Sequence, residues 1–389
     1  MRLALTEAQQ RRYGAARQFA ATHLAPHAGA WDAAQAVPLA VIGQLAAEGY
    51  LGANVAPEFG GFGYDSLSYG LLHEAIGAGC SSVRSLLTVH GMVCHAVGRW
   101  GSAALRQEVL PALARGELLG AFALSEPDAG SDVGAIALSA TATDAGFVLD
   151  GTKQWITFGQ LADRFIVFAR GEQGPGAFLV DRDSPGLSIE PITGMLGTRA
   201  SMLARLRFTQ CRVPATRLLG KLGFGQSHVL ASTLDWGRFS VAWGSVGIGQ
   251  ACLDSVLDYV PRRVQSGAPL AQHQLVQRHL TGMVARLHAA RLLCHQAALA
   301  RERKDPQHMT DTQLAKYQAA LCATELAHSA VQLLGANGCT PAYPVERLWR
   351  DARIMEIIEG TNEVLELHIA RAVLEGYGCD IPLAPGDAQ

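Results

Sequence analysis

Two helical regions enclose a stretch of short β-like segments, and this change of pattern constrains the fold of the 389-residue chain more than any other feature. Up to about residue 118, Ala and Leu are dense and apolar residues recur at helical spacing, as in Leu67 to Ile76. From about Gly120 to Phe224, short apolar and aromatic runs alternate with Gly, Pro and Asp turns. Long helical patterns then return.

We therefore predict an α+β chain with three domains: a helical domain over 1–118, a mostly antiparallel β domain over 119–225, and a helical bundle domain over 226–389. The predicted strands contain Phe147–Leu149, Gln154–Thr157, Phe165–Phe168, Ala177–Val180 and Leu206–Phe208. The predicted long helices cover 226–260, 270–303, 310–335 and 363–375.

Composition excludes several classes of protein. The chain is 49% hydrophobic and 17% charged, with a net charge of −2, so no basic excess points to nucleic acid. No apolar run is long enough to span a bilayer, and the start resembles an amphipathic helix rather than a secretory signal. The 8 Cys are scattered without a Cys/His ligand cluster. We interpret them as small core residues in a reducing cytoplasm, not as disulfides or a metal site.

An acidic residue near the end of the chain is the first candidate for catalysis. Glu359 follows two bulky apolar residues and precedes Gly360, which allows φ > 0 and close approach by another group. Thr361 or Asn362 can then cap a helix from Val364 to about Leu374. Burial at such a helix break raises the pKa of a carboxyl toward neutrality, as a general base at pH 7 needs. The alternative is a surface Glu before a turn.

Three other sites offer ligand-binding groups. Arg84 opens an apolar helix, where it pairs with a nearby carboxylate or holds a negative group of a ligand. The turn from Ser125 to Asp132 offers hydroxyls and free backbone N–H groups. Trp155 and Thr157 lie on one predicted strand face, where a flat ring could stack. Taken alone, Arg84 is equally explained by an ion pair, whereas a turn of this kind and a strand Trp are more often structural than ligand-binding.

Taken together and in this order, the motifs resemble those of the acyl-CoA dehydrogenase family along nearly the whole chain. The matching landmarks are Ser125-Glu126-Pro127, Gly130-Ser131-Asp132, Trp155-Ile156-Thr157, Arg263-Val264-Gln265-Ser266-Gly267, His273-Gln274, Gln332-Leu333-Leu334-Gly335-Ala336-Asn337-Gly338 and Glu359-Gly360-Thr361. The resemblance implies a helical N-terminal domain, a β-barrel-like middle and a C-terminal four-helix bundle, with FAD bound between the last two. It also implies a homo-oligomer, a dimer or tetramer, with a shared FAD site.

The resemblance assigns roles by position. Residues expected to contact the flavin or the thioester end of the substrate are Ser125, Ser131, Trp155 and Thr157. Residues expected to hold the FAD pyrophosphate and adenosine, partly from a neighbouring subunit, are Arg263, Gln274, Gln332 and Gly335. Residues expected to complete the site beside the base are Thr361 and Glu363. Asp235 and Arg238 match positions that face the thioester tail.

The chemistry implied by the resemblance needs one base and one hydride acceptor. Glu359 would take the α-proton of a thioester while flavin N5 takes the β-hydride, with hydrogen-bond donors on the carbonyl oxygen. On a carrier-bound 2-hydroxy-3-oxo acyl group, the same parts could oxidise a hydrated aldehyde to a carboxylate. The electron acceptor is expected to be an electron-transferring flavoprotein or dioxygen.

Two branches of the family share further features with the chain. Arg84 matches the position at which the glutaryl-CoA branch grips the distal carboxylate of its substrate. The segments Cys80 to Ser85, Ser240 to Gly244 and Met355 to Gly360 look most like a second branch. That branch acts on small polar acyl groups on an acyl carrier protein, as in methoxymalonyl extender-unit synthesis.

We favour the carrier-protein branch of polyketide-type pathways. The alternatives are a catabolic acyl-CoA dehydrogenase, glutaryl-like or short-chain, and a non-catalytic bundle protein. Departures from the family pattern are Ser266, Ala336, Phe158 and Ile358, which concern the substrate class more than FAD binding.

Overall fold

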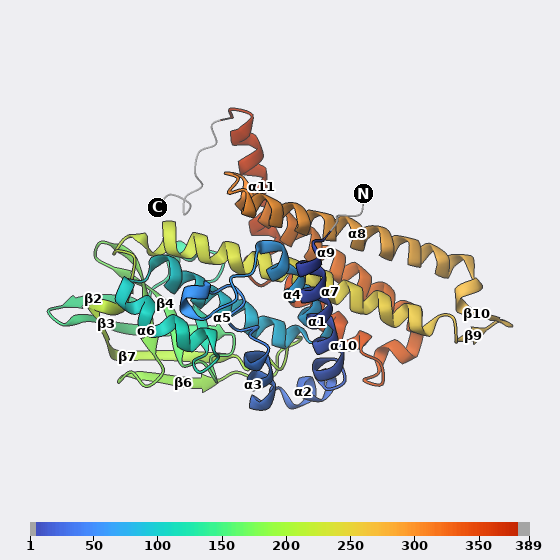
Figure 1. Ribbon diagram of the computed structural model, residues 1–389, viewed down its shortest axis with the longest axis horizontal. Helices are drawn as coiled ribbons and strands as arrows, with labels where there is room; N and C mark the ends of the chain where they lie inside the picture. The colour runs from blue at the N-terminus through green and yellow to red at the C-terminus, as the bar shows by residue number, and fades with distance from the viewer. Residues whose placement is uncertain (1–4, 380–389) are drawn as a thin grey trace.

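The computed structural model describes residues 5–379, with a β sheet at one end and long helices at the other (Figure 1). The first four residues of the expected N-terminal domain and the last ten of the C-terminal domain lie outside this range. The first helix begins with a capping box, in which the Thr6 side chain accepts from the Gln9 N–H. The N-terminal helices are α1 (Glu7–Phe19), α2 (Ala28–Ala34), α3 (Leu39–Ala47), α4 (Ser66–Gly79), α5 (Ser81–Trp100) and α6 (Ala103–Ala114).

Within residues 5–379, eight strands form one sheet in the order β6-β7-β3-β2-β4-β5-β8, with β1 beside β4. The strands are β1 (Gly120–Ala123), β2 (Ser139–Thr143), β3 (Gly146–Ile156), β4 (Arg164–Gly171), β5 (Gly174–Asp181), β6 (Leu187–Pro191), β7 (Ala204–Pro214) and β8 (Leu218–Leu219). Pairing is antiparallel except where β4 meets β1 and β2, so the mostly antiparallel prediction is confirmed. Two of the predicted runs, Phe147–Leu149 and Gln154–Thr157, merge into the single strand β3, which ends at Ile156.

The C-terminal helices follow the predicted segments closely, with one addition. They are α7 (Ala231–Tyr259), α8 (Gln274–Glu302), α9 (His308–Leu334), α10 (Val345–Met355) and α11 (Asn362–Gly376). The sequence did not predict α10 as a separate helix. Helix α7 packs against α4 and α5 on one side and against α8 and α9 on the other, so it joins the N-terminal helices to the bundle. Helix α11 packs on α9 and projects from the body of the molecule (Figure 1).

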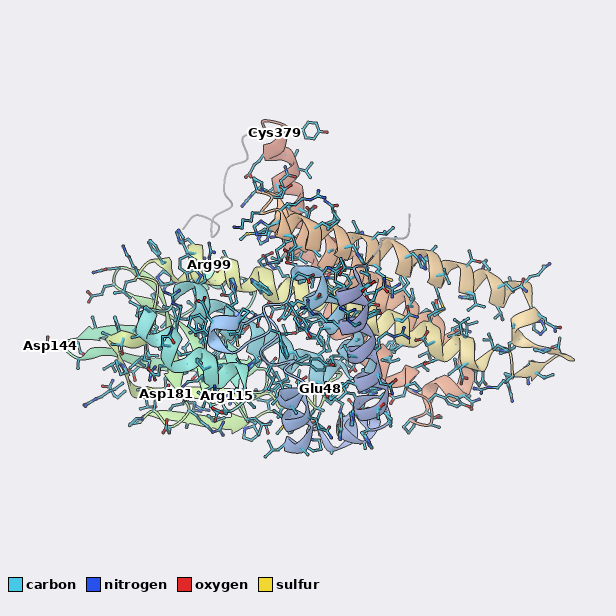
Figure 2. The ribbon with its side chains drawn as sticks, viewed as in Figure 1. Glu48, Arg99, Arg115, Asp144, Asp181 and Cys379 are labelled. Atoms are coloured by element: carbon cyan, nitrogen blue, oxygen red, sulfur yellow. The ribbon has the colours of Figure 1, made fainter. Side chains whose placement is uncertain are left out.

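The cysteine interpretation needs a correction at two positions. Six of the eight Cys are buried and free, as expected for small core residues. Cys339 and Cys379 are exposed instead. Figure 2 shows why for Cys379, which lies at the end of the projecting helix α11, far from Asp144 at the tip of the β2–β3 hairpin. Composition does not show where in the fold a Cys lies, and a short side chain near a helix end at the surface has no apolar neighbours to bury it.

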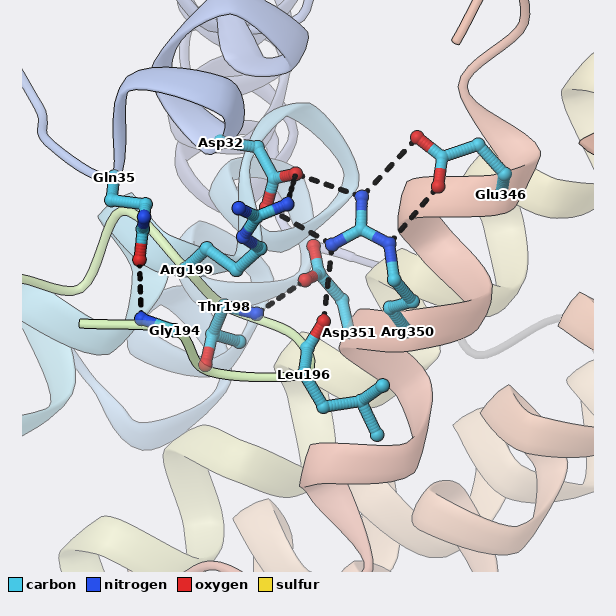
Figure 3. A network of polar contacts seen from close by, with 9 residues as sticks. All are labelled: Asp32, Gln35, Gly194, Leu196, Thr198, Arg199, Glu346, Arg350 and Asp351. Carbon is cyan, nitrogen blue, oxygen red and sulfur yellow. Dashed lines mark hydrogen bonds and ion pairs between the residues drawn. The ribbon is translucent and has the colours of Figure 1, made fainter. Parts of the chain in front are cut away.

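A network of charged groups ties α10 to two distant parts of the chain (Figure 3). Arg350 binds Asp32 of α2 through Nη2 at 2.7 Å and Glu346 of its own helix through Nε at 3.0 Å. Its Nη1 also donates to the carbonyl of Leu196 at 3.1 Å. Asp351, the next residue of α10, accepts from the Thr198 N–H at 2.5 Å. The network therefore fixes α10 against the N-terminal helices and the loop of the β domain before β7.

We expect Arg350→Met to lower the free energy of unfolding by about 2 kcal/mol, because it leaves the largely buried Asp32 with only Arg199 at 3.9 Å. Thermal unfolding measured by circular dichroism checks this. The matched control is Arg11→Met, which removes an exposed pair with Glu7 and should change stability by at most about 0.5 kcal/mol. Equal effects of the two substitutions would contradict a structural role for the network.

Candidate active site

The turn between α10 and α11 holds Glu359 in an unusual backbone conformation. Glu359 has φ +56° and Gly360 has φ +91°, so two successive residues are left-handed and the chain reverses sharply. The Asn362 N–H donates to the Glu356 carbonyl across the turn at 3.0 Å. The helix that follows begins at Asn362, with Thr361 as its N-cap. Of the two caps that the sequence allowed, Thr361 is the one used. A non-glycine residue with positive φ is uncommon and is often found at functional sites.

The Glu359 carboxylate is buried against α7. The residue as a whole is half-buried, yet its Oε2 atom is inaccessible to solvent and has no hydrogen-bond partner. Gly237 of α7 makes this possible, because a Cβ at that position would lie 2.2 Å from Oε2. Burial raises the pKa of Glu359 to about 7, although Arg238, Lys316 and Arg84 act to lower it. The burial predicted from the sequence is therefore present, and the role as base stays a prediction.

Two cations bind the backbone of the turn rather than its carboxylate. Arg238 Nε donates to the Glu359 carbonyl at 3.1 Å, and Lys316 Nζ donates to the Gly360 carbonyl at 2.7 Å. Burial lowers the pKa of Lys316 to about 8. The sequence predicted Arg238 but neither Lys316 nor Gly237. A Lys on the apolar face of α9 and a Gly inside α7 were the available signals, since Gly in a helix interior costs about 1 kcal/mol relative to Ala.

Arg84 lies in the core near this turn without an acidic partner. It is fully buried, and among the described residues no carboxylate comes within ion-pair distance of it. Nη1 donates to Thr88 Oγ1 at 2.9 Å, Nη2 reaches only the Met355 sulfur at 3.2 Å, and Nε has no partner. Burial lowers the pKa of Arg84 to about 10, with Glu359 opposing the shift. Of the two readings that the sequence left open, the ion pair is absent within residues 5–379.

The end of β3 presents an aromatic surface. The β3–β7 pairing shifts register between Lys153 and Ile156, and Trp155 at this irregularity has φ +63° and is 48% exposed. Thr157 just beyond the strand is half-buried. An indole with this much exposed surface offers a flat apolar face on which a flavin ring could stack.

A buried ion pair ties the Ser125 turn to the same strand. Lys153 Nζ binds Glu126 Oε1 at 2.7 Å, and the Ser125 carbonyl accepts from the Gln154 N–H at 2.8 Å. Ser125 is half-buried, whereas Ser131 is exposed. The turn and the strand therefore form one rigid wall, with the hydroxyls of the turn at its edge.

The residues assigned to the far end of FAD are not gathered with this wall. Arg263 lies beside the hairpin β9 (Val264–Gln265) and β10 (Ala268–Pro269), at the opposite end of the molecule from the sheet (Figure 1). Residues exposed around this end of the bundle are Arg263, Gln274, Gln332 and Gly335. Glu363, in the first turn of α11, is also exposed. A single chain thus leaves the two groups apart, and a shared site stays a prediction.

Asp235 is engaged by other residues of the chain. Its Oδ2 binds Arg301 at 2.7 Å, with His308 at 3.7 Å. Its Oδ1 is buried and has no partner among the described residues. One acceptor is therefore left for a ligand, and the predicted contact with the thioester tail stays a prediction.

Three family models cover almost the whole chain. The N-terminal, middle and C-terminal domains of acyl-CoA dehydrogenase match residues 6–117, 121–211 and 227–374. The chain belongs to the acyl-CoA dehydrogenase family. The human mitochondrial short-chain specific acyl-CoA dehydrogenase is 37% identical over 379 residues, covering 96% of this chain and 92% of the relative. The enzyme is accordingly an FAD-dependent oxidoreductase.

Two solved structures bear on the cofactor and the branch. A glutaryl-CoA dehydrogenase from Mycobacterium smegmatis in complex with FADH2 superposes with a TM-score of 0.91 at 30% identity, covering 95% of each chain. FkbI, described as serving biosynthesis of the methoxymalonyl extender unit of the FK520 polyketide, superposes with a TM-score of 0.86 at 34% identity. That match covers 94% of this chain and 99% of FkbI. No helix among residues 5–379 has the length and apolarity to cross a membrane.

We expect Gly237→Ala to abolish most activity while leaving the fold intact. The new methyl group would displace Glu359 Oε2 and the Met92 sulfur, which would lie 2.2 and 2.8 Å from it. A loss of about 100-fold in kcat/KM is expected from a misplaced base. Gly43→Ala is the matched control, because a Cβ there meets nothing within 4 Å. Steady-state kinetics check this, with FAD content and thermal stability measured alongside. Full activity of Gly237→Ala would contradict the requirement for the Glu359 carboxylate to lie against Gly237.

The raised pKa of Glu359 predicts a pH profile. The base must be unprotonated, so the rate of flavin reduction by substrate should rise about tenfold per pH unit up to about 7 and then level off. The folded state also holds this proton more tightly than the unfolded chain, so the group's contribution to stability falls as pH rises from 4.5 toward 7. Anaerobic stopped-flow bleaching from pH 5.5 to 8.5 measures the profile. Glu359→Gln should lack the rising limb and remain yellow, and full bleaching of that variant would refute the role as base.

Proposed function

We propose that the enzyme oxidises a small acyl thioester with a polar or anionic far end, delivered on an acyl carrier protein. The observation that carries this proposal is Arg84. A fully buried guanidinium whose Nε has no partner, and whose Nη2 meets only a thioether, lacks compensation for its desolvation. A carboxylate or another polar acceptor on the substrate would supply it, since hydrogen bonds to charged groups are worth more than neutral ones.

The residues around the turn fit the two ends of such a substrate. Glu359 takes the proton from the carbon next to the thioester carbonyl, because its buried carboxylate is basic at neutral pH. Arg84 binds the far end of the acyl group. Asp235, through its unpartnered Oδ1, accepts from an amide N–H of the carrier arm, and Arg238 holds the turn beside it. FAD, when bound, supplies the hydride acceptor.

We infer that the cofactor is held by two sets of residues. The set proposed to contact the ring and the thioester end comprises Ser125, Ser131, Trp155 and Thr157, with Thr361 and Glu363 beside the base. The set proposed to bind the pyrophosphate and adenosine of a neighbouring subunit comprises Arg263, Gln274, Gln332 and Gly335. The exposure of this second set at the far end of the bundle supports a homo-oligomer. A cytoplasmic location and an electron-transferring flavoprotein or dioxygen as acceptor complete the proposal.

The choice of carrier rests on the likeness to FkbI, at 34% identity. The likeness to the human short-chain enzyme, at 37%, supports the second candidate, a catabolic acyl-CoA dehydrogenase. Presenting one short polar acyl group on CoA and on a purified acyl carrier protein separates the two. The proposal requires faster anaerobic flavin reduction from the carrier protein. Faster reduction from CoA would favour the catabolic enzyme.

We expect Arg84→Met to remove the preference for a polar acyl end. The preference is measured as the ratio of kcat/KM for glutaryl-CoA to that for pentanoyl-CoA, two thioesters of equal length that differ in a terminal carboxylate. Loss of a buried charge-assisted contact should lower this ratio by about 100-fold. Met keeps the volume of the side chain and its contact with Met355. A ratio that is near one in the wild type, or unchanged in the variant, would contradict the proposal.

A further inference from the structure

A chain of buried polar groups stands behind Arg84 and connects three helices. Arg84 Nη1 donates to Thr88 Oγ1, one turn further along α5, at 2.9 Å. Thr88 Oγ1 lies 2.6 Å from Ser240 Oγ of α7, which lies 2.8 Å from His73 Nδ1 of α4. All four side chains are at least 97% buried. Hydroxyls and an imidazole at this depth are costly unless each makes a hydrogen bond, so their alignment is a built feature.

The backbone of α7 leaves room for the guanidinium beside this chain. Gly244 lies one turn after Ser240, on the same face of the helix. A Cβ at Gly244 would come within 2.7 Å of Arg84 Cδ and Nε. Ser240 and Gly244 therefore act together, the first by contacting Thr88 and the second by letting the Arg84 side chain lie flat along α7.

The hydrogen-bond donors can be arranged along the chain without a charged imidazole. The guanidinium is always a donor, so Thr88 Oγ1 accepts from it. The Thr88 hydroxyl donates either to the Arg84 carbonyl, at 3.0 Å, or to Ser240, and in either case a neutral imidazole can complete the bond between Ser240 and His73 Nδ1. Burial and the nearby Arg84 lower the pKa of His73 well below its usual value, in agreement with that state. Arg84 is then the charged member of the group, and its Nε and Nη2 are the donors left over.

We propose that Ser240 and His73 are positioning residues that, through Thr88, fix the Arg84 guanidinium with Nε and Nη2 toward the acyl end of the substrate. The inference rests on the proposed function of Arg84 and adds the residues that set its orientation. A guanidinium on a flexible stem loses entropy when it is held in one geometry, so a prior anchor on Nη1 lowers the cost of binding the substrate's polar end. The network is thus a determinant of acyl specificity carried by α4, α5 and α7.

The test measures binding without turnover. In FAD-loaded enzyme carrying Glu359→Gln, the dissociation constants for glutaryl-CoA and pentanoyl-CoA are titrated through the change in flavin absorbance. Ser240→Ala should weaken binding of glutaryl-CoA by roughly tenfold, because Thr88 loses the hydrogen bond to Ser240 that helps to hold its hydroxyl against Arg84, with a much smaller change for pentanoyl-CoA. Thr88→Val, which removes the hydroxyl and keeps the shape, should do the same. Thr88→Ser, which keeps the hydroxyl, should restore the preference.

Ser245→Ala is the matched control. Ser245 is fully buried on the same helix, and its hydroxyl bonds only to the Val241 carbonyl of its own helix. An equal loss of preference in Ser240→Ala and Ser245→Ala, or an unchanged preference in Ser240→Ala and Thr88→Val, would overturn the inference. Arg84→Met in the same titration distinguishes a failure of the proposed function from a failure of the positioning role. If it abolishes the preference while the network variants do not, the proposed function stands and this inference falls; if it changes nothing, the proposed function falls with it.

Discussion

The charged groups of two side chains, Glu359 and Arg84, are buried away from water at the centre of this molecule. A carboxylate oxygen without a hydrogen-bond partner and a guanidinium with unfilled donors both lie in the interior, near one helix turn. They act on each other electrostatically but do not form an ion pair. A fold selected for stability alone would pair such charges or replace them. Here the apolar packing of the surrounding helices bears the cost, and each group stays available to a ligand.

The helix α7 makes this arrangement possible through its small residues. Gly237 admits the carboxylate, Gly244 admits the guanidinium, and Ser240 between them joins the polar network. These positions are separated by three and four residues, so they line one face of the helix. Glycine in a helix interior weakens the helix, and the dense packing of α7 against α4, α5 and α9 offsets that loss. The same face of α7 therefore lies against both Glu359 and Arg84.

Sequence patterns predicted the regular elements and failed where long-range contacts decide. The long helical segments predicted α8 and α9 within a few residues, because a helical pattern over many turns is a strong signal. The short strands β1, of sequence Gly-Ala-Phe-Ala, and β2, of sequence Ser-Ala-Thr-Ala-Thr, carry no such signal and were not predicted. The motif resemblance located Glu359 and Arg84. It did not locate Lys316, whose partner carbonyl is 44 residues away, or the contact of Ser240 with His73 across 167 residues.

Arg238 and Lys316 hold the turn after α10 through its main chain, and this has a separate consequence. These two side chains contact main-chain carbonyl oxygens, which every amino acid possesses, so these two hydrogen bonds do not depend on which side chain stands at position 359. The hydrogen bonds that hold this turn thus involve main-chain atoms, and the carboxylate belongs to the side chain. A different side chain at position 359 would therefore keep both hydrogen bonds, provided that it tolerates the left-handed backbone of this position.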